Sequence, residues 1–300
     1  MRSNSPFITE TSHAIHEIYY MLRHYDWKKY GSALRKPMLV FMVNNAKGFY
    51  VGGMVDRFKG MISTYAWCKQ RNIDFRIRHI FPFELADYLD PSHYDGRLRE
   101  NEFSTSIWDA TLMRARGEYG RRLVKKKEIR KQIHYYGNRD FLDYINQTGG
   151  TNYTWGELFK ELFQPGKELL ELVKQKSREI SKPYISAVFR FQNLLGDFEE
   201  YKFSTLNDEN RREELIKKCL NGLIDLQEQY PEMSILVTSD STTFIDRASE
   251  LPGIYVIGGK RVHMGCTADA AYDTYLNSFV DFYMLADSRR IFSLGTDEMY

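Results

Sequence analysis

The sequence predicts an α/β fold of two Rossmann-like, doubly wound domains that face each other across a cleft. The 300 residues are about twice the length of a typical single domain. Apolar runs of strand length alternate with segments of helical periodicity in the first third of the chain and again in the last third. The pair Lys182-Pro183 divides these regions, because proline prevents a helix from continuing into Tyr184. We therefore expect domains at residues 1–182 and 183–300.

The first domain opens with one clear strand–loop–helix unit. Residues 38–43 are continuously apolar, as expected for a buried parallel strand. The loop 44–53 contains three glycines, and apolar residues recur at helical spacing over 54–70, which predicts an amphipathic helix. Charged and apolar residues alternate over 74–80, which predicts a second strand, and residues 13–24 are expected to form a helix before this unit.

The middle of the chain, about residues 104–182, differs in composition and is expected to be a helical insertion. It is rich in Arg, Lys and Glu and carries no strong strand signal. Residues 114–139 hold ten Lys and Arg against two Glu. A solvated helix face explains this run most simply, and an anionic membrane surface or a polyanionic partner is the alternative.

The last third alternates regularly between strands and helices. We expect strands at 184–191, 234–238, 253–257 and 290–294, with helices around 215–224, 242–250 and 272–286. This order predicts a parallel, doubly wound sheet.

Composition and charge exclude several classes of protein. Hydrophobic residues make up 43% and charged residues 27%, so extended disorder is not expected. Forty-two Lys and Arg against forty Asp and Glu give a net charge of +2, so we expect no nucleic-acid partner. Three cysteines at unrelated spacings exclude a disulfide framework, and neither a signal peptide nor a membrane span is visible. We expect a cytoplasmic protein.

Ligands of open α/β sheets bind beyond the carboxyl ends of the strands. The candidates are therefore the residues that follow each predicted strand: Gly52-Gly53, Arg190, Ser239-Asp240-Ser241, Gly258-Gly259 and Gly295-Thr296. Small residues let the backbone approach a ligand, hydroxyls at helix N-termini bind phosphate, and arginine supplies charge. Together they predict a site for an anionic ligand.

Several of these residues also have plain structural explanations. Asp56 suits the first turn of a helix as a cap, and Arg57 either clamps an acceptor or faces solvent. Arg190 interrupts an apolar strand, so it either binds a ligand or forms a buried ion pair. Asp240 or Ser241 is expected to cap the following helix in addition to holding a nucleotide.

The order of these motifs resembles that of the α1,2-, α1,6- and protein O-fucosyltransferases. The segment from Gly52-Gly53 through Asp56-Arg57 resembles the GG-x-x-D/N-R/Q loop of these families, and Arg190 lies where they carry the Arg of an H-x-R motif. Val188 stands in place of the histidine of that motif. The Ser239-Asp240-Ser241 segment resembles their S/T-D-D/S element, and Asp281 falls where they have an aspartate before the last strand.

The resemblance implies a GT-B fold and a metal-independent, inverting transfer of fucose from a GDP-sugar to a glycan or a lipid-linked glycan. The nucleotide would be held by Ser239, Asp240, Ser241 and Thr296, and Gly52, Gly53, Asp56 and Arg57 would close the site from the first domain. Arg190 would stabilise the departing diphosphate, a role that suits its planar, always-charged fork. No cofactor or metal is expected. A non-catalytic relative that binds a nucleotide or a glycan as a scaffold is the alternative.

The catalytic base is expected among the carboxylates that follow Arg190. Asp197, Glu199 and Glu200 lie there, and Gly196 before them provides a turn. In an extended chain Asp197 and Glu199 share a face and Glu200 lies on the other. Glu199 is the first candidate, Asp197 the second and Asp56 the third. The basic run 114–139 would let the enzyme dock loosely on the inner membrane surface.

Overall fold

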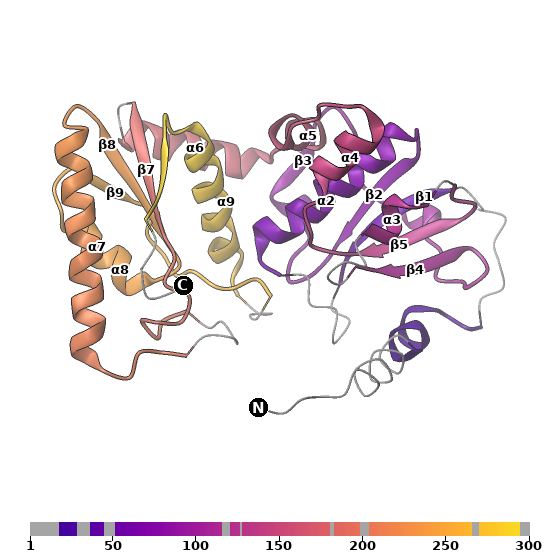
Figure 1. The fold of residues 1–300 in the computed structure, drawn as a ribbon, viewed down its shortest axis with the longest axis horizontal. Coiled ribbons are helices and arrows are strands. Elements are labelled where there is room, and N and C mark those ends of the chain that lie inside the picture. The colour runs from indigo at the N-terminus through magenta and orange to yellow at the C-terminus, as the bar shows by residue number, and fades with distance from the viewer. Residues whose placement is uncertain are drawn as a thin grey trace. The chain divides into compact units, whose positions relative to one another are not determined.

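The computed structural model describes residues 18–28, 37–44, 52–115, 121–126, 128–180, 183–198, 204–265 and 270–294. The chain forms two compact units (Figure 1). The first contains residues 1–85 and 91–164, and the second contains residues 86–90 and 165–300. The division differs from the expected boundary at residue 182, because helix α6 (Lys167–Ile180) groups with the second unit, where it packs on α9 (Tyr272–Asp287).

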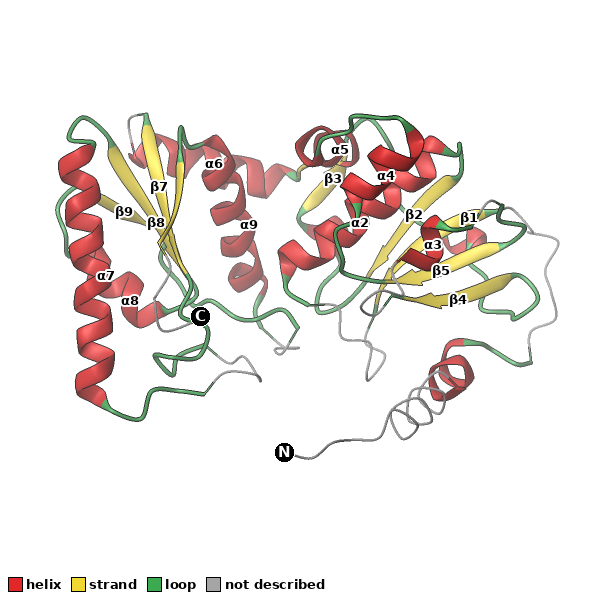
Figure 2. Cartoon of the chain, in the orientation of Figure 1, coloured by secondary structure: helices red, strands yellow, loops and turns green. Residues whose placement is uncertain are grey.

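The first unit is built on a four-stranded parallel sheet, drawn in yellow in Figure 2. Its strand order is β2 (Asp74–His79), β1 (Met38–Val43), β5 (Gln132–Tyr136) and β4 (Ala110–Arg114). The predicted strands at 38–43 and 74–80 are confirmed, and all six residues of β1 are buried. This burial explains why β1 is continuously apolar.

Helix α2 (Met54–Gln70) follows β1, as predicted, and is buried on more than one face. It contacts β1 and β2 on one side, and α4 (Leu142–Gly149) and α5 (Trp155–Leu162) on the other. Gly60 allows this close packing, since a Cβ atom there would clash with the carbonyl oxygen of Gly137 after β5. Polar residues of α2 are buried with partners; for example, Ser63 donates a hydrogen bond to Asp140 at 3.1 Å.

The segment 104–182 holds more helix than strand, as expected, but it is not a helical insertion alone, because it also contributes strands to the sheet. This segment contributes β4 and β5 to the sheet, in addition to α3 (Arg121–Val124), α4, α5, α6 and the short strand β6 (Phe163–Pro165). All five residues of β5 are buried although they include Gln132 and His134. These two polar side chains hydrogen-bond to each other, Nε2 to Oε1 at 3.1 Å, so a buried strand here lacks the usual apolar signature.

Shorter elements complete the first half of the chain. The helical segment 18–24 covers part of the sheet, with Tyr20 buried against Met38, Val40, Met42 and Tyr136. The 3₁₀ turns η1 (Leu85–Asp87) and η2 (Glu100–Glu102) follow β2, and β3 (Leu89–Pro91) pairs with β6 in a two-stranded sheet. The expected helix at 13–24 is thus seen over its described part, and residues 1–17 lie outside the described residues.

The second unit contains the parallel sheet that the last third predicted. Its order is β10 (Ile291–Leu294), β7 (Tyr184–Phe189), β8 (Ser234–Ser239) and β9 (Ile254–Val256). Numbered within this unit, that order is the 3-2-1-4 arrangement of a Rossmann half. Helices α7 (Glu209–Gln229), α8 (Thr242–Ser249) and α9 occupy the predicted positions.

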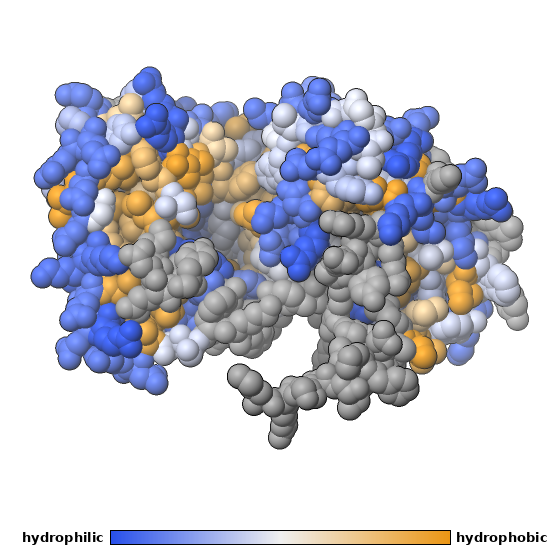
Figure 3. Space-filling model, viewed as in Figure 1, coloured by the Kyte–Doolittle hydropathy of each residue, from blue (hydrophilic) through white to orange (hydrophobic). Residues whose placement is uncertain are grey.

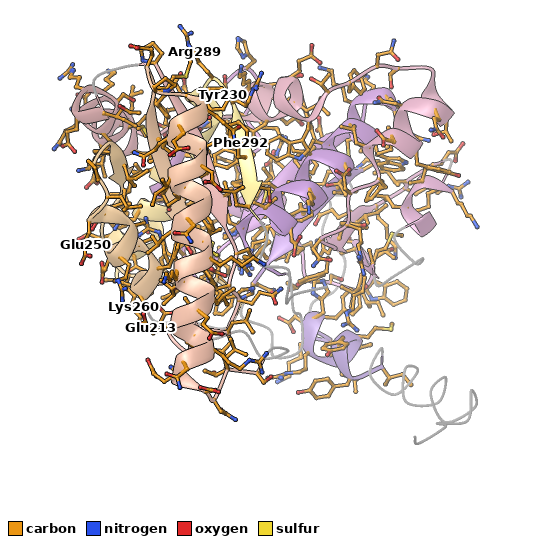
Figure 4. All side chains as sticks on the ribbon, turned by 60° about the vertical axis from the view of Figure 1, so that its left-hand side comes forward. Glu213, Tyr230, Glu250, Lys260, Arg289 and Phe292 are labelled. Atoms are coloured by element: carbon orange, nitrogen blue, oxygen red, sulfur yellow. The ribbon has the colours of Figure 1, made fainter. Side chains whose placement is uncertain are left out.

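Aromatic rings fill much of the core of the second unit. Phe189 and Phe191 pack on Phe244 of α8, with ring centroids 4.5 and 4.9 Å apart. At the end of α7, the ring of Tyr230 packs on Phe292 of β10 at 5.6 Å (Figure 4). Within the described part of the chain, no helix is long and apolar enough to cross a membrane.

Candidate functional site

Open α/β sheets bind ligands where the strand order reverses, so the candidate binding site of each unit is expected at that point. In the second unit this point lies between β7 and β10. Arg190 directly follows β7, and Ser239 ends the neighbouring strand β8. Thr296, which follows β10, lies outside the described residues. The described part of this site is therefore built from the ends of β7, β8 and β9.

Arg190 is a half-exposed cation anchored from two sides. Its Nη1 atom lies 3.3 Å from Oδ2 of Asp240, and its guanidinium lies over the ring of Phe198, 5.0 Å from the centroid. The Arg190 side chain is 45% exposed, whereas that of Asp240 is 4% exposed. The expectation of a buried ion pair thus holds in part, because Arg190 pairs with the buried Asp240 while its own side chain stays half exposed.

Asp240 positions the turn that follows β7. Its two oxygens accept hydrogen bonds from the backbone N–H groups of Phe191 and Gln192, at 2.8 and 2.7 Å. Gln192 has a φ of 56°, a left-handed conformation that non-glycine residues adopt only when held there. Burial raises the pKa of the Asp240 carboxyl, and the Arg190 charge opposes that rise. The predicted nucleotide-binding Asp240 is therefore committed to the backbone and to Arg190.

Ser241 and Asp197 together cap helix α8. The Oγ atom of Ser241 accepts a hydrogen bond from the Phe244 N–H at 3.1 Å, which confirms the expected N-cap. The same hydroxyl donates to Oδ2 of Asp197 at 2.9 Å, and the Thr243 N–H donates to that oxygen at 2.8 Å. Asp197 therefore supplies the negative charge that this helix N-terminus favours.

The segment after Arg190 is not extended. Residues 192–198 form turns and bends, so the extended chain for which Asp197 and Glu199 would share a face is absent at Asp197. Gly196 has a φ of 83°, which makes the turn expected there. Glu199 and Glu200 lie outside the described residues.

A buried ion pair orders the loop that follows β9. Nε and Nη2 of Arg261 bind the two oxygens of Asp281 on α9, at 2.8 and 3.2 Å. The same guanidinium donates to the carbonyl oxygens of Ile257 and Gly259, at 2.8 and 2.9 Å. Burial raises the pKa of Asp281 to about 6, against the lowering effect of Arg261. Motif order indicated Asp281, but its arginine partner has no sequence signal beyond a basic, glycine-flanked loop.

The candidate loop of the first unit lies at the reversal point between β1 and β5. Gly52 has a φ of 74°, and a Cβ atom there would lie 2.7 Å from the Asp56 carboxylate and 3.0 Å from Asn138, which follows β5. Gly53 is the N-cap of α2 and provides no side-chain hydrogen bond. Asp56 is 46% exposed and lies 3.5 Å from Lys59, so it occupies the first turn as expected.

Arg57 is buried and holds this loop to the end of β2. Its Nε atom donates to the Gly52 carbonyl oxygen at 3.1 Å, and Nη1 donates to Phe81 O at 2.8 Å and to Nε2 of His79 at 3.2 Å. Burial and the Arg57 charge lower the pKa of His79 to about 3, so the ring is neutral and accepts this bond. Arg57 thus does not face solvent, and its contacts with Gly52, His79 and Phe81 position this loop.

A chain of hydrogen bonds that sequence reasoning missed lies beside β1 and β5. His24 Nε2 lies 2.7 Å from His134 Nδ1, and the Tyr136 hydroxyl lies 3.4 Å from His24 Nδ1. Asn44, directly after β1, donates to that hydroxyl at 2.8 Å. Burial and Arg78 lower the pKa of His24 to about 4, and burial places that of His134 well below its usual value. A separation of 110 residues hides this pair in the sequence.

No group of three or more His, Cys, Asp or Glu side chains within the described ranges could hold a metal ion. Arg190 in the second unit and Asp56 in the first are each about half exposed, and each lies near an oppositely charged partner in its own unit. The arrangement can bind an anion electrostatically at the end of β7.

Solved structures share this fold at low sequence identity. The α1,6-fucosyltransferase NodZ co-crystallised with GDP is 12% identical, with a TM-score of 0.54 over 86% of this chain and 88% of that one. The fucosyltransferase NodZ from Bradyrhizobium is 12% identical, with a TM-score of 0.55 over 85% of this chain and 87% of that one. A mutant of Arabidopsis thaliana FUT1 in complex with GDP is 11% identical, with a TM-score of 0.51 over 92% of this chain and 69% of that one. No family model matches the chain, and a search of curated proteins finds no match. The fold is therefore the GT-B fold of these fucosyltransferases.

Proposed function

We propose that the protein is a metal-independent, inverting glycosyltransferase that transfers fucose from GDP-fucose to a hydroxyl group of a glycan in polysaccharide or surface-glycan synthesis. The observation that carries the proposal is the position of Arg190, a half-exposed cation directly after β7 at the reversal point of a Rossmann sheet. Proteins with this fold have been crystallised with GDP and soaked with GDP-fucose. A diphosphate is the ligand chemistry that such a cation recognises.

In this proposal Arg190 stabilises the negative charge that develops on the departing GDP. Asp240 and Phe198 hold the guanidinium in place before the donor binds, so little reorganisation is needed during the reaction. Arg57 holds the Gly52-Gly53 loop for its proposed role on the acceptor side. Glu199 is the proposed base, because Asp197 is committed to capping α8. The acceptor is a glycan or a lipid-linked glycan.

A non-catalytic scaffold that binds a nucleotide or a glycan is the second candidate. One observation favours it: Asp197 and Asp240 have hydrogen-bonding roles within the fold. On this alternative the protein binds GDP through Arg190 and transfers no sugar to any acceptor.

The proposed reaction is tested by release of GDP from GDP-fucose in the presence of a panel of glycan acceptors. Arg190→Ala should lower turnover by about 10²–10³-fold, as expected for loss of one charge-stabilising donor. Arg247→Ala is the matched control, because Arg247 is 44% exposed in the same unit and pairs with Glu213 on the helix surface. Glu199→Gln should lower turnover by about 10²–10⁴-fold if that carboxylate is the base. GDP binding without turnover on any acceptor would support the scaffold, and normal turnover in Arg190→Ala would refute the role of Arg190.

A further inference from the structure

The helical segment 18–24 presents an apolar face to solvent. Tyr20 is buried against the sheet, and Tyr25 after the helix is also buried. The outward side chains are large and exposed: Ile18 57%, Tyr19 44%, Met21 39% and Leu22 57%. A surface helix normally turns its polar residues outward. This helix therefore exposes apolar residues on the side where solvent contact favours polar ones.

Two tryptophans extend this apolar surface. The indole of Trp27 is 52% exposed and that of Trp108 is 66% exposed. A backbone hydrogen bond of 3.0 Å from Asp26 to Thr105 brings the loop of Trp27 beside the turn of Trp108, which precedes edge strand β4. The Trp27 N–H donates to the Leu22 carbonyl oxygen at 3.2 Å, so its one polar atom is satisfied within the protein. Hydrophobic atoms reach the surface at the lower right of Figure 3, in the region of β4 in Figure 1.

Basic side chains accompany the same surface. Arg23 and Lys28 are exposed beside the apolar residues of the helix. Lys131 donates to the Ile107 carbonyl oxygen at 3.1 Å, which places residues 128–131 and their two basic side chains next to the Trp108 turn. Among the residues that the structure describes, acidic neighbours of this surface include Asp26, the buried Asp109 and Glu128, and Glu128 lies 3.8 Å from the exposed Arg130. We call the surface formed by Ile18, Tyr19, Met21, Leu22, Trp27 and Trp108 with these cations the β4-edge surface.

We propose that the β4-edge surface docks on an anionic lipid bilayer. Aliphatic and indole side chains enter the boundary between headgroups and acyl chains, and lysine and arginine bind the anionic headgroups beside them. A second copy of the chain fits less well, because a symmetric contact would bring two basic surfaces together. This surface lies wholly in the first unit, and the proposal does not rest on the proposed transferase activity.

Cosedimentation of the full chain with vesicles tests the proposal. Binding should occur with vesicles of phosphatidylcholine mixed with phosphatidylglycerol, weaken with added salt, and fall strongly with pure phosphatidylcholine. Leu22→Asp and Trp108→Asp should each weaken binding by about tenfold or more, since each removes a large apolar side chain from the bilayer and adds an anion. Ile224→Asp is the matched control, because Ile224 is 39% exposed on α7 of the second unit and should leave binding unchanged.

A second readout locates the contact. Brominated lipids should quench the fluorescence of the wild type, and the double variant Trp27→Phe, Trp108→Phe should lose that quenching although Trp67 and Trp155 remain. Unchanged thermal unfolding shows that each variant is folded. Lack of binding to mixed vesicles, or equal binding by Leu22→Asp and wild type, overturns the proposal. A wild-type dimer that Leu22→Asp converts to a monomer, without vesicle binding, would assign the surface to a second copy.

Discussion

Acidification should destabilise the first unit through its buried histidines. His79 and His24 have pKa values lowered to about 3 and about 4 by burial and by the neighbouring charges of Arg57 and Arg78, and His134 has its pKa lowered as well. All three rings are neutral in the folded state and gain a proton on unfolding once the pH lies below the ordinary value of 6.5. Their contribution to the free energy of unfolding is therefore full above pH 6.5 and is lost as the pH falls toward the pKa values of the folded state.

The size of the effect follows from the number of protons taken up. A histidine that is neutral when folded changes the free energy of unfolding by about 1.4 kcal/mol per pH unit well below pH 6.5. Between pH 7 and pH 5 the loss is about 2 kcal/mol for each histidine and about 6 kcal/mol for three. That is comparable to the whole stability of a typical domain. Staying at or above pH 5 limits the contribution of Glu102, because its ordinary pKa is 4.5 and its folded pKa is lower.

Tryptophan fluorescence makes the measurement specific for the first unit. All four tryptophans lie in this unit, so their emission during urea unfolding at pH 7, 6 and 5 reports on it alone. His134→Gln should reduce the pH dependence by about one third, because one titrating proton is removed. His93→Gln is the control, since it replaces an exposed histidine of the same unit.

Asp281 in the second unit should contribute with the opposite sign. The folded pKa of Asp281, about 6, lies above its ordinary value of 3.8, so the folded state binds the extra proton and this contribution is lost as the pH rises through 6.

A free energy of unfolding of the first unit that is flat between pH 7 and pH 5 would refute the assignment of the three histidines as neutral and buried.

Three further predictions concern packing, charge and capping. In urea unfolding, Gly60→Ala should lower the free energy of unfolding by about 1–3 kcal/mol, because its Cβ atom clashes with a backbone carbonyl. Gly222→Ala is the control, because Gly222 has open space around it, and this change should raise the free energy of unfolding by up to about 1 kcal/mol. Asp281→Asn should cost about 3–5 kcal/mol, because it leaves the buried Arg261 without its anion, and a small change in thermal unfolding would contradict the ion pair. Asp197→Asn should lower the free energy of unfolding by about 1 kcal/mol, because it weakens the cap of α8. The same variant should release GDP from GDP-fucose at close to the wild-type rate. A large loss of turnover would instead identify Asp197 as the base.

The sequence predicted the second unit almost completely because its strands are apolar and its helices periodic. Residues 234–238 and 290–294 fall within one residue of β8 and β10. The first unit was harder to predict from sequence, since β5 buries Gln132 and His134, and edge strand β4 ends in Arg114. Hydropathy alone cannot recognise a strand whose buried polar groups are satisfied by distant partners.

The positions of the candidate residues at strand ends were predictable from sequence, whereas their side-chain contacts were less so. The rule that ligands bind beyond strand ends placed Arg190 and Asp240, which the structure brings within 3.3 Å of each other. The same rule could not show that Arg57 is buried or that Asp197 caps α8, because these roles depend on contacts between separate elements. The fold came from local patterns, whereas side-chain roles depended on tertiary contacts.

The central claim is that the end of β7 binds a nucleoside diphosphate through Arg190, and calorimetric titration of GDP tests it most directly. Wild type and Arg247→Ala should bind GDP with equal affinity, and Arg190→Ala should bind about tenfold to a hundredfold more weakly, as expected for the loss of hydrogen bonds between charged groups. UDP and ADP, titrated in parallel, show which base the site selects. Wild-type protein that binds no GDP, or Arg190→Ala protein that binds it as tightly as wild type, would contradict the claim.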